Sequence, residues 1–94
     1  MAIRELDIEI KDGVATCKPM PLTVDGGDQV VWKNGLAVVY RPSPFMEGGG
    51  PFDATSKPST IKKGVFTRQQ KFHAFVTIGG QEKPCNGQII IRDP

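Results

Sequence analysis

Hydrophobic and polar residues alternate with a period of two along much of the chain. Over residues 4–11, Leu6, Ile8 and Ile10 alternate with charged side chains, a pattern typical of a β-strand with one face in water. Similar segments predict further strands at residues 14–18, 22–24, 29–33, 36–41, 60–62, 71–78 and 88–92. No stretch long enough for a helix shows a 3.6-residue period.

Turn residues separate these segments. The chain contains 11 glycines and 8 prolines, and Asp12-Gly13 is a hairpin signal between the first two predicted strands. Short strands joined by regular turns favour an all-β sandwich or barrel. A chain of 94 residues is the size of one domain. We therefore expect a single domain over residues 1–94, an antiparallel β-sandwich of seven to eight strands.

One segment, from Pro42 to Pro58, is long, irregular and rich in Pro, Gly and Ser. Connections of this length are often functional. Phe45 and Phe52 bracket a glycine triplet, which lacks the Gly-Lys-Ser/Thr sequence of a phosphate-binding loop. Either the two rings tuck into the end of the sandwich and hold the segment, or they form an exposed contact patch. Phe45, Met46 and Phe52 are thus candidates for an interaction loop.

Composition excludes several classes of partner. A net charge of +2, with the basic residues scattered, gives no reason to expect nucleic-acid binding. No window is long and apolar enough for a transmembrane segment. No signal peptide is recognisable at the N-terminus, so a cytoplasmic location is expected unless Met1 replaces a removed leader, in which case a periplasmic or secreted location is favoured.

The two cysteines, Cys17 and Cys85, belong to no zinc or redox motif. Two buried free thiols, a structural disulfide and, less readily, a metal pair all remain open. His73, the only histidine, lies within a predicted strand, where a satisfied or solvent-facing role is expected. No catalytic pairing of His73 with a serine or a cysteine follows a known motif, so we expect no enzyme.

One stretch matches a known pattern: Cys17-x-Pro19-x-x-Leu22-Thr23-Val24-x-x-Gly27-Asp28-x-Val30-x-Trp32-x-Asn34. It resembles the N-terminal half of the cupredoxins, the small blue-copper proteins, whose pattern is Phe-x-Pro-x-x-Ile-x-Val-x-x-Gly-Asp-x-Val-x-Trp-x-Asn. Residues 87–91 are similar to the last cupredoxin strand, and residues 72–78 to the strand before the copper loop. About half the chain is covered. The resemblance implies a Greek-key sandwich with Val30 and Trp32 pointing inward.

The copper ligands of that family are missing. A blue-copper site needs two histidines, a cysteine and usually an axial methionine. Residues 35–39, where the first histidine belongs, contain no ligand, and the cysteine position falls on Val76 or Thr77. Residues 79–81 lack the second histidine, and Cys85 occupies the methionine position. No copper or other cofactor is therefore expected.

The resemblance also implies that Cys17 and Cys85 are neighbours, since both positions lie at the metal end of the family's sandwich. A disulfide would then replace the metal as a staple. In the chain-entropy model, closing a loop of about 70 residues stabilises a fold by roughly 4 kcal/mol.

The function expected from these observations is a non-catalytic binding or structural module, with contacts made by residues 42–58 or 79–86. A protein is one candidate partner, and the oligomeric state is open. The alternative is a metal-binding or electron-transfer protein that uses Cys17, Cys85 and either Met20 or Met46. A second alternative for the fold is an immunoglobulin-like sandwich, since Trp32 lies between the cysteines, although Pro84 beside Cys85 is unsuited to a central strand.

Overall fold

The computed structural model describes residues 2–33, 35–64 and 71–92, and within these ranges the chain is all-β. None of these residues forms a helix, so none forms one that is long and apolar enough to cross a membrane. The strands are β1 (Ile3–Lys11), β2 (Val14–Lys18), β3 (Leu22–Asp25), β4 (Gln29–Trp32), β5 (Val38–Arg41), β6 (Ser59–Thr60), β7 (His73–Ile78), β8 (Gln81–Asn86) and β9 (Ile89–Arg92).

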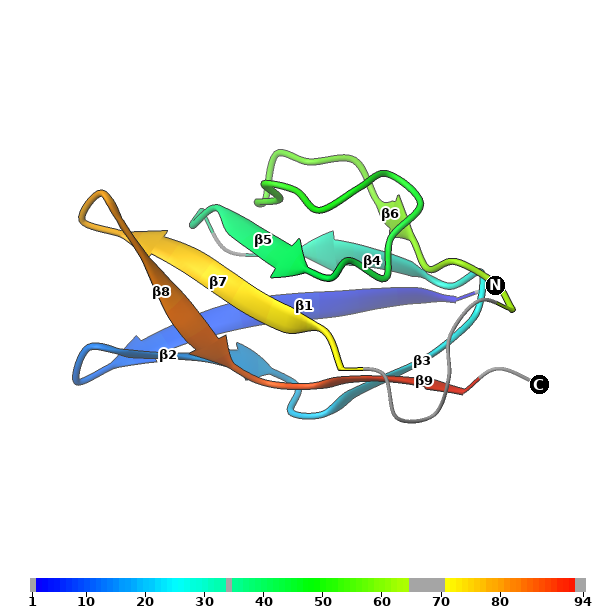
Figure 1. The fold of residues 1–94 in the computed structure, drawn as a ribbon, viewed down its shortest axis with the longest axis horizontal. Helices are drawn as coiled ribbons and strands as arrows, with labels where there is room; N and C mark the ends of the chain where they lie inside the picture. The colour runs from blue at the N-terminus through cyan, green and yellow to red at the C-terminus, as the bar shows by residue number, and fades with distance from the viewer. Residues whose placement is uncertain (1, 34, 65–70, 93–94) are drawn as a thin grey trace.

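Seven strands form one curled sheet in the order β5-β7-β8-β2-β1-β4-β6, and β3 pairs with β9 in a second, two-stranded sheet (Figure 1). The pairs β1–β4, β2–β8 and β3–β9 are parallel, and the other pairs are antiparallel. The prediction of a purely antiparallel arrangement was therefore wrong. Alternation of side chains shows which residues form strands, but it carries no information on the direction of a partner that is distant in the sequence.

The strand β8 was not predicted; its residues had been assigned to a loop. It follows β7 in a hairpin through Gly79 and Gly80, both of which have positive φ, as such tight turns require. Pro84 is tolerated because β8 pairs with β2 only at Cys85 and Asn86. The first part of β8 has β7 on one side and no described strand on the other, the edge setting that accepts proline.

The segment between β5 and β6, residues 42–58, connects the two outer strands of the curled sheet (Figure 1). At one side, Phe52 forms a bridge with Val38 of β5; at the other, Phe45 forms a bridge with Ile61, just after β6. The Met46 N–H also donates to the Thr60 carbonyl at 2.8 Å. The irregular segment is therefore bonded to the sheet at both ends and covers both of its edges.

Alternation along the strands decides which side chains are buried. In β1, Leu6 and Ile8 are buried, whereas Ile10, near the hairpin, is exposed. In β4, Val30 and Trp32 point into the core, as the cupredoxin resemblance implies. Asn34, the last residue of that motif, lies outside the described residues. The core therefore follows the period of two predicted from the sequence, apart from the hairpin end of β1, where Ile10 is paired with β2 but exposed.

Candidate functional site

Of the three residues predicted to form an interaction loop, only Met46 is exposed. Phe45 is 0% exposed and Phe52 6% exposed, whereas Met46 is 67% exposed. The Phe52 ring stacks on Trp32 with centroids 4.4 Å apart, and the Phe45 ring contacts Trp32 and Tyr40 edge-on, both at 5.3 Å. The two rings hold residues 42–58 against the core, and they offer no surface to a partner.

The structure brings Cys17 and Cys85 together, the neighbourhood that the resemblance implied. The parallel pairing of β2 with β8 sets Ala15 opposite Cys85, and Cys17 lies on the same inward face of β2. The two Sγ atoms are 2.8 Å apart, and both thiols are buried. The contact with Cys85, together with burial, raises the pKa of Cys17. The cysteines are free thiols in this structure, so the disulfide stays a prediction.

Gly87 leaves the space that the side chain of Cys17 occupies. A Cβ atom at Gly87 would lie 2.6 Å from the Cβ of Cys17, closer than two such atoms can come. The glycine of the last-strand pattern is therefore needed because the β2 side chain occupies the space where its own side chain would be.

The region around the thiols is almost completely filled. Burial raises the pKa of Tyr40, and the nearby Cys17 adds to this effect. Among the described residues, no hydrogen-bond partner is found for the Nε1 of Trp32 or the hydroxyl of Tyr40. The space between Cys17, Tyr40 and Phe72 amounts to about 10 Å³. That is room for one water molecule and too little for an organic ligand.

The positions that the resemblance assigns to copper ligands do not all meet at one point. Val38 and Val76 pair across β5 and β7 and are fully buried. The glycines at the second histidine position lie at the tip of the β7–β8 hairpin. At ~3.3 Å per residue, Gln81 is roughly 13 Å along β8 from Cys85. His73, at the start of β7 opposite Arg41, is exposed.

The methionines of the sulfur-ligand alternative differ from the thiols in exposure. Met20 and Met46 are exposed at 59% and 67%, whereas both cysteines are buried. Over residues 2–33, 35–64 and 71–92, no group of three or more His, Cys, Asp or Glu side chains is placed to hold a metal ion.

The cysteine positions also distinguish the fold from the immunoglobulin alternative. In immunoglobulin domains the cysteines lie on opposing sheets. Here Cys17 and Cys85 lie on β2 and β8, which are neighbours in one sheet.

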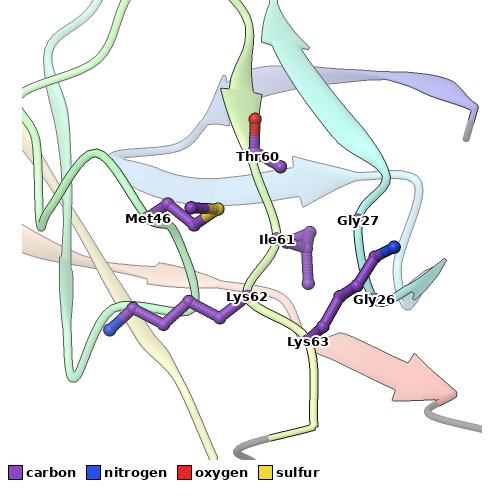
Figure 2. A pocket seen from close by; sticks show the side chains of 7 residues that line it. All are labelled: Gly26, Gly27, Met46, Thr60, Ile61, Lys62 and Lys63. Atoms are coloured by element: carbon purple, nitrogen blue, oxygen red, sulfur yellow. The ribbon is translucent and has the colours of Figure 1, made fainter.

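A cavity of ligand size lies elsewhere, between the β3–β4 turn and residues 61–63, the segment that directly follows β6 (Figure 2). Its volume is about 510 Å³, within the usual range for small-molecule sites. Figure 2 shows Ile61 between Met46 on one side and the glycines of the turn on the other. The residues that line this cavity, called the turn pocket below, are Gly26, Gly27, Met46, Thr60, Ile61, Lys62 and Lys63.

Backbone hydrogen bonds fix the walls of the turn pocket. The Gly27 N–H donates to the Ile61 carbonyl at 2.9 Å, and the Ile61 N–H donates to the Asp28 carbonyl at 2.8 Å. Gly27 has a φ of 88°, a conformation that glycine adopts without strain. The stem of Lys63 lies directly against it: a Cβ at Gly27 would be 2.4 Å from the lysine Cε.

The turn itself depends on Asp28. Its carboxylate is buried and accepts hydrogen bonds from the N–H groups of Asp25 and Ala2, both at 2.9 Å, and from Arg4 at 3.5 Å. The Asp25 N–H is the main cause that lowers the pKa of Asp28, and it outweighs the opposing effect of burial. The Gly-Asp pair of the motif therefore fixes the position of one wall of the turn pocket.

Of the residues that line the turn pocket, only Met46 was predicted from the sequence to contact a partner. Lys62 and Lys63 are adjacent in the sequence, but they count there only as scattered basic residues. The pocket is formed from three segments that are distant in the chain, and the available signal, a lysine pair directly after Ile61, is weak.

Comparison of the chain with protein-family models and with curated proteins finds no match. The cupredoxin resemblance therefore rests on the residues of this chain alone.

Proposed function

We propose that this protein is a non-catalytic binding module on a cupredoxin-like Greek-key sandwich without a copper site, and that the turn pocket is its binding site. Two features of the motif support the scaffold. Val30 and Trp32 are core residues of β4, and Gly27 and Asp28 form the turn before it. These are the structural roles that the resemblance assigns to them.

The observation that carries the proposal is the contrast between the two candidate positions. The copper positions are filled by Val38 and Val76 or lie apart at a hairpin tip, and the remaining space near Cys17 is about 10 Å³. The turn pocket offers about 510 Å³. A small molecule is therefore accommodated at the turn pocket without rearrangement of the core.

The hydrogen bonds of the acidic side chains near the turn pocket also favour binding over catalysis. The buried carboxylate of Asp28 is occupied by the N–H groups that hold the turn, and Glu47 accepts a hydrogen bond from the Thr60 N–H at 2.6 Å. Lys62 and Lys63 are the ionisable side chains that line the turn pocket, and no described contact orients either of them by a carboxylate. A catalytic role would require a positioned acid, base or nucleophile.

Copper titration tests the absence of a metal site. The reduced protein is titrated with Cu(I), and separately with Cu(II), while native mass spectra and absorption spectra are recorded. We expect no tightly bound stoichiometric copper and no thiolate charge-transfer band. One copper per chain, lost on Cys85→Ser and retained in a control variant distant from the sulfur donors such as Lys11→Met, would overturn the proposal.

The metal-binding alternative has one observation in its favour, the 2.8 Å approach of the two thiols. Soft thiolates do bind Cu(I). Binding at this position would require both buried thiols to lose protons and the core around Tyr40 to open. The same titration decides between the two functions.

A further inference from the structure

The turn pocket combines apolar surface with two lysines. The exposed thioether of Met46 and the stems of the lysines supply the apolar surface, whereas Ile61 is 0% exposed and supports the pocket from within the core. In Figure 2, the side chains of Lys62 and Lys63 extend in different directions from the segment that follows β6, so that the two cations flank the cavity. A site with an apolar interior and cationic groups at its margin fits a molecule with an apolar body and an anionic group.

The nearby acids do not neutralise these lysines. Asp25 pairs with Arg92 at 3.3 Å, and Asp28 with Arg4 at 3.5 Å. Glu47 is bonded to the Thr60 N–H. Within the described parts of the chain, neither Lys62 nor Lys63 forms an ion pair. The acids around the turn pocket are therefore committed to structural roles, and the two ammonium groups remain available to a ligand.

We infer that the turn pocket binds a small anionic amphiphile, such as a medium-chain carboxylate, with its apolar part against Met46 and the lysine stems and its anionic group at Lys62 or Lys63. This inference rests on the proposed function, because it names the ligand class of the same site. A neutral apolar molecule would make the apolar contacts but no ion pair with the lysines, and a cation would be repelled by both lysines.

The stem of Lys63 adds a means of adjustment. It crosses the face of Gly27, where no side chain competes for the space. Lysine has a flexible four-carbon stem, so the ammonium group can follow an anionic group over several ångströms while the stem still covers apolar surface.

Three probes with the same chain length separate the contributions of charge and apolar contact: decanoate, 1-decanol and decyltrimethylammonium, each kept below the concentration at which it aggregates. Binding is followed by two-dimensional ¹H–¹⁵N NMR of the full chain. We expect decanoate to shift the amide signals of Gly26, Gly27, Lys62 and Lys63. With two partly exposed cations, its affinity should exceed that of decanol by about tenfold.

Variants then assign the two contributions. Lys62→Met and Lys63→Met keep an unbranched apolar stem but remove the charge, and each should weaken decanoate about threefold while leaving decanol unchanged. Lys11→Met, at the end of β1, is the matched control and should change neither affinity. Met46→Gln should weaken decanoate and decanol by the same factor.

The outcomes distinguish the inference from the proposed function. Equal affinities for decanoate and decanol at the turn pocket would overturn the anionic class but leave a binding pocket. No shift of the turn-pocket amides with decanoate would overturn the inference, whereas copper binding through Cys85 would overturn the proposed function independently. Shifts centred on other residues would also count against the inference.

Discussion

The interior around Cys17 and Cys85 and the turn pocket are built from similar elements, strands and tight turns, but they differ in what fills them. Around the cysteines, aromatic rings, aliphatic side chains and two thiols leave about 10 Å³. At the turn pocket, two glycines and two outward lysine stems leave about 510 Å³. The difference indicates that the first region supplies stability and the second is available for binding.

The comparison also shows that a metal site and a core make different demands on the side chains. A metal site requires several donors at one point, whereas a core requires only matched apolar volume. Val38 and Val76, which pair across β5 and β7, contribute apolar volume and no metal-ligating atom. The turn that contains Gly27 and Asp28 is likewise held by hydrogen bonds within the protein.

The largest expected difference in stability is between substitutions at two adjacent residues of the segment 42–58, Phe45 and Met46. Phe45→Ala removes a ring that contacts Trp32 and Tyr40, and it should lower the free energy of unfolding by about 3–5 kcal/mol. Met46→Ala removes an exposed side chain and should change it by less than about 0.5 kcal/mol. Urea denaturation followed by the fluorescence of Trp32 measures both, and equal effects would contradict the assignment of Phe45 to the core.

A smaller effect is expected from added volume beside the thiols. Gly87→Ala places a methyl group against Cys17 and should destabilise the protein by about 1–3 kcal/mol. Gly35 has open space around it, so Gly35→Ala is the matched control and should cause little loss. A neutral Gly87→Ala variant, by the same urea assay, would show that the region is less tightly packed than described.

On the side of the turn pocket, Asp28→Asn should lower the stability at pH 7 by about 1–3 kcal/mol, because the acceptor of the turn's N–H groups loses its charge. The pKa of Asp28 is lowered in the folded state from an ordinary value of 3.8. Its contribution to stability is thus present above about pH 4 and is lost as the pH falls through the folded value.

Thermal unfolding between pH 7 and pH 2 measures this contribution. The decline in stability below pH 4 should be shallower in Asp28→Asn than in the unsubstituted protein. The exposed Glu5, paired with Lys33 at 3.4 Å, provides a control: Glu5→Gln should change the stability at pH 7 by less than about 0.5 kcal/mol. Parallel pH curves for Asp28→Asn and the unsubstituted protein would contradict the assigned role.

The sequence predicts the strands whose two faces differ in polarity. β1, β2 and β4 follow from alternation, and the inward direction of Val30 and Trp32 follows from the same period. β8 does not follow, because five of its six residues are exposed and one is a proline. Its place depends on pairing with β7 and β2, which only the assembled sheet supplies.

The candidate site shows the same limit. The proximity of Cys17 and Cys85 follows from the resemblance, because family positions carry information on where distant residues meet. The turn pocket has no such guide. Gly27, Met46 and Lys63 become neighbours only when the segment 42–58 closes the space between β5 and β6.

The most direct test of the account is whether Cys17 and Cys85 form a disulfide across the packed interior. The protein is incubated with glutathione disulfide, its remaining thiols are alkylated after unfolding, and its peptides are mapped by mass. Oxidation transfers two electrons and two protons from the thiols to glutathione disulfide, which becomes two glutathione molecules. We expect a Cys17–Cys85 linked peptide and a gain in stability of up to about 4 kcal/mol over the reduced protein. Two fully alkylated cysteines after this treatment would contradict the account.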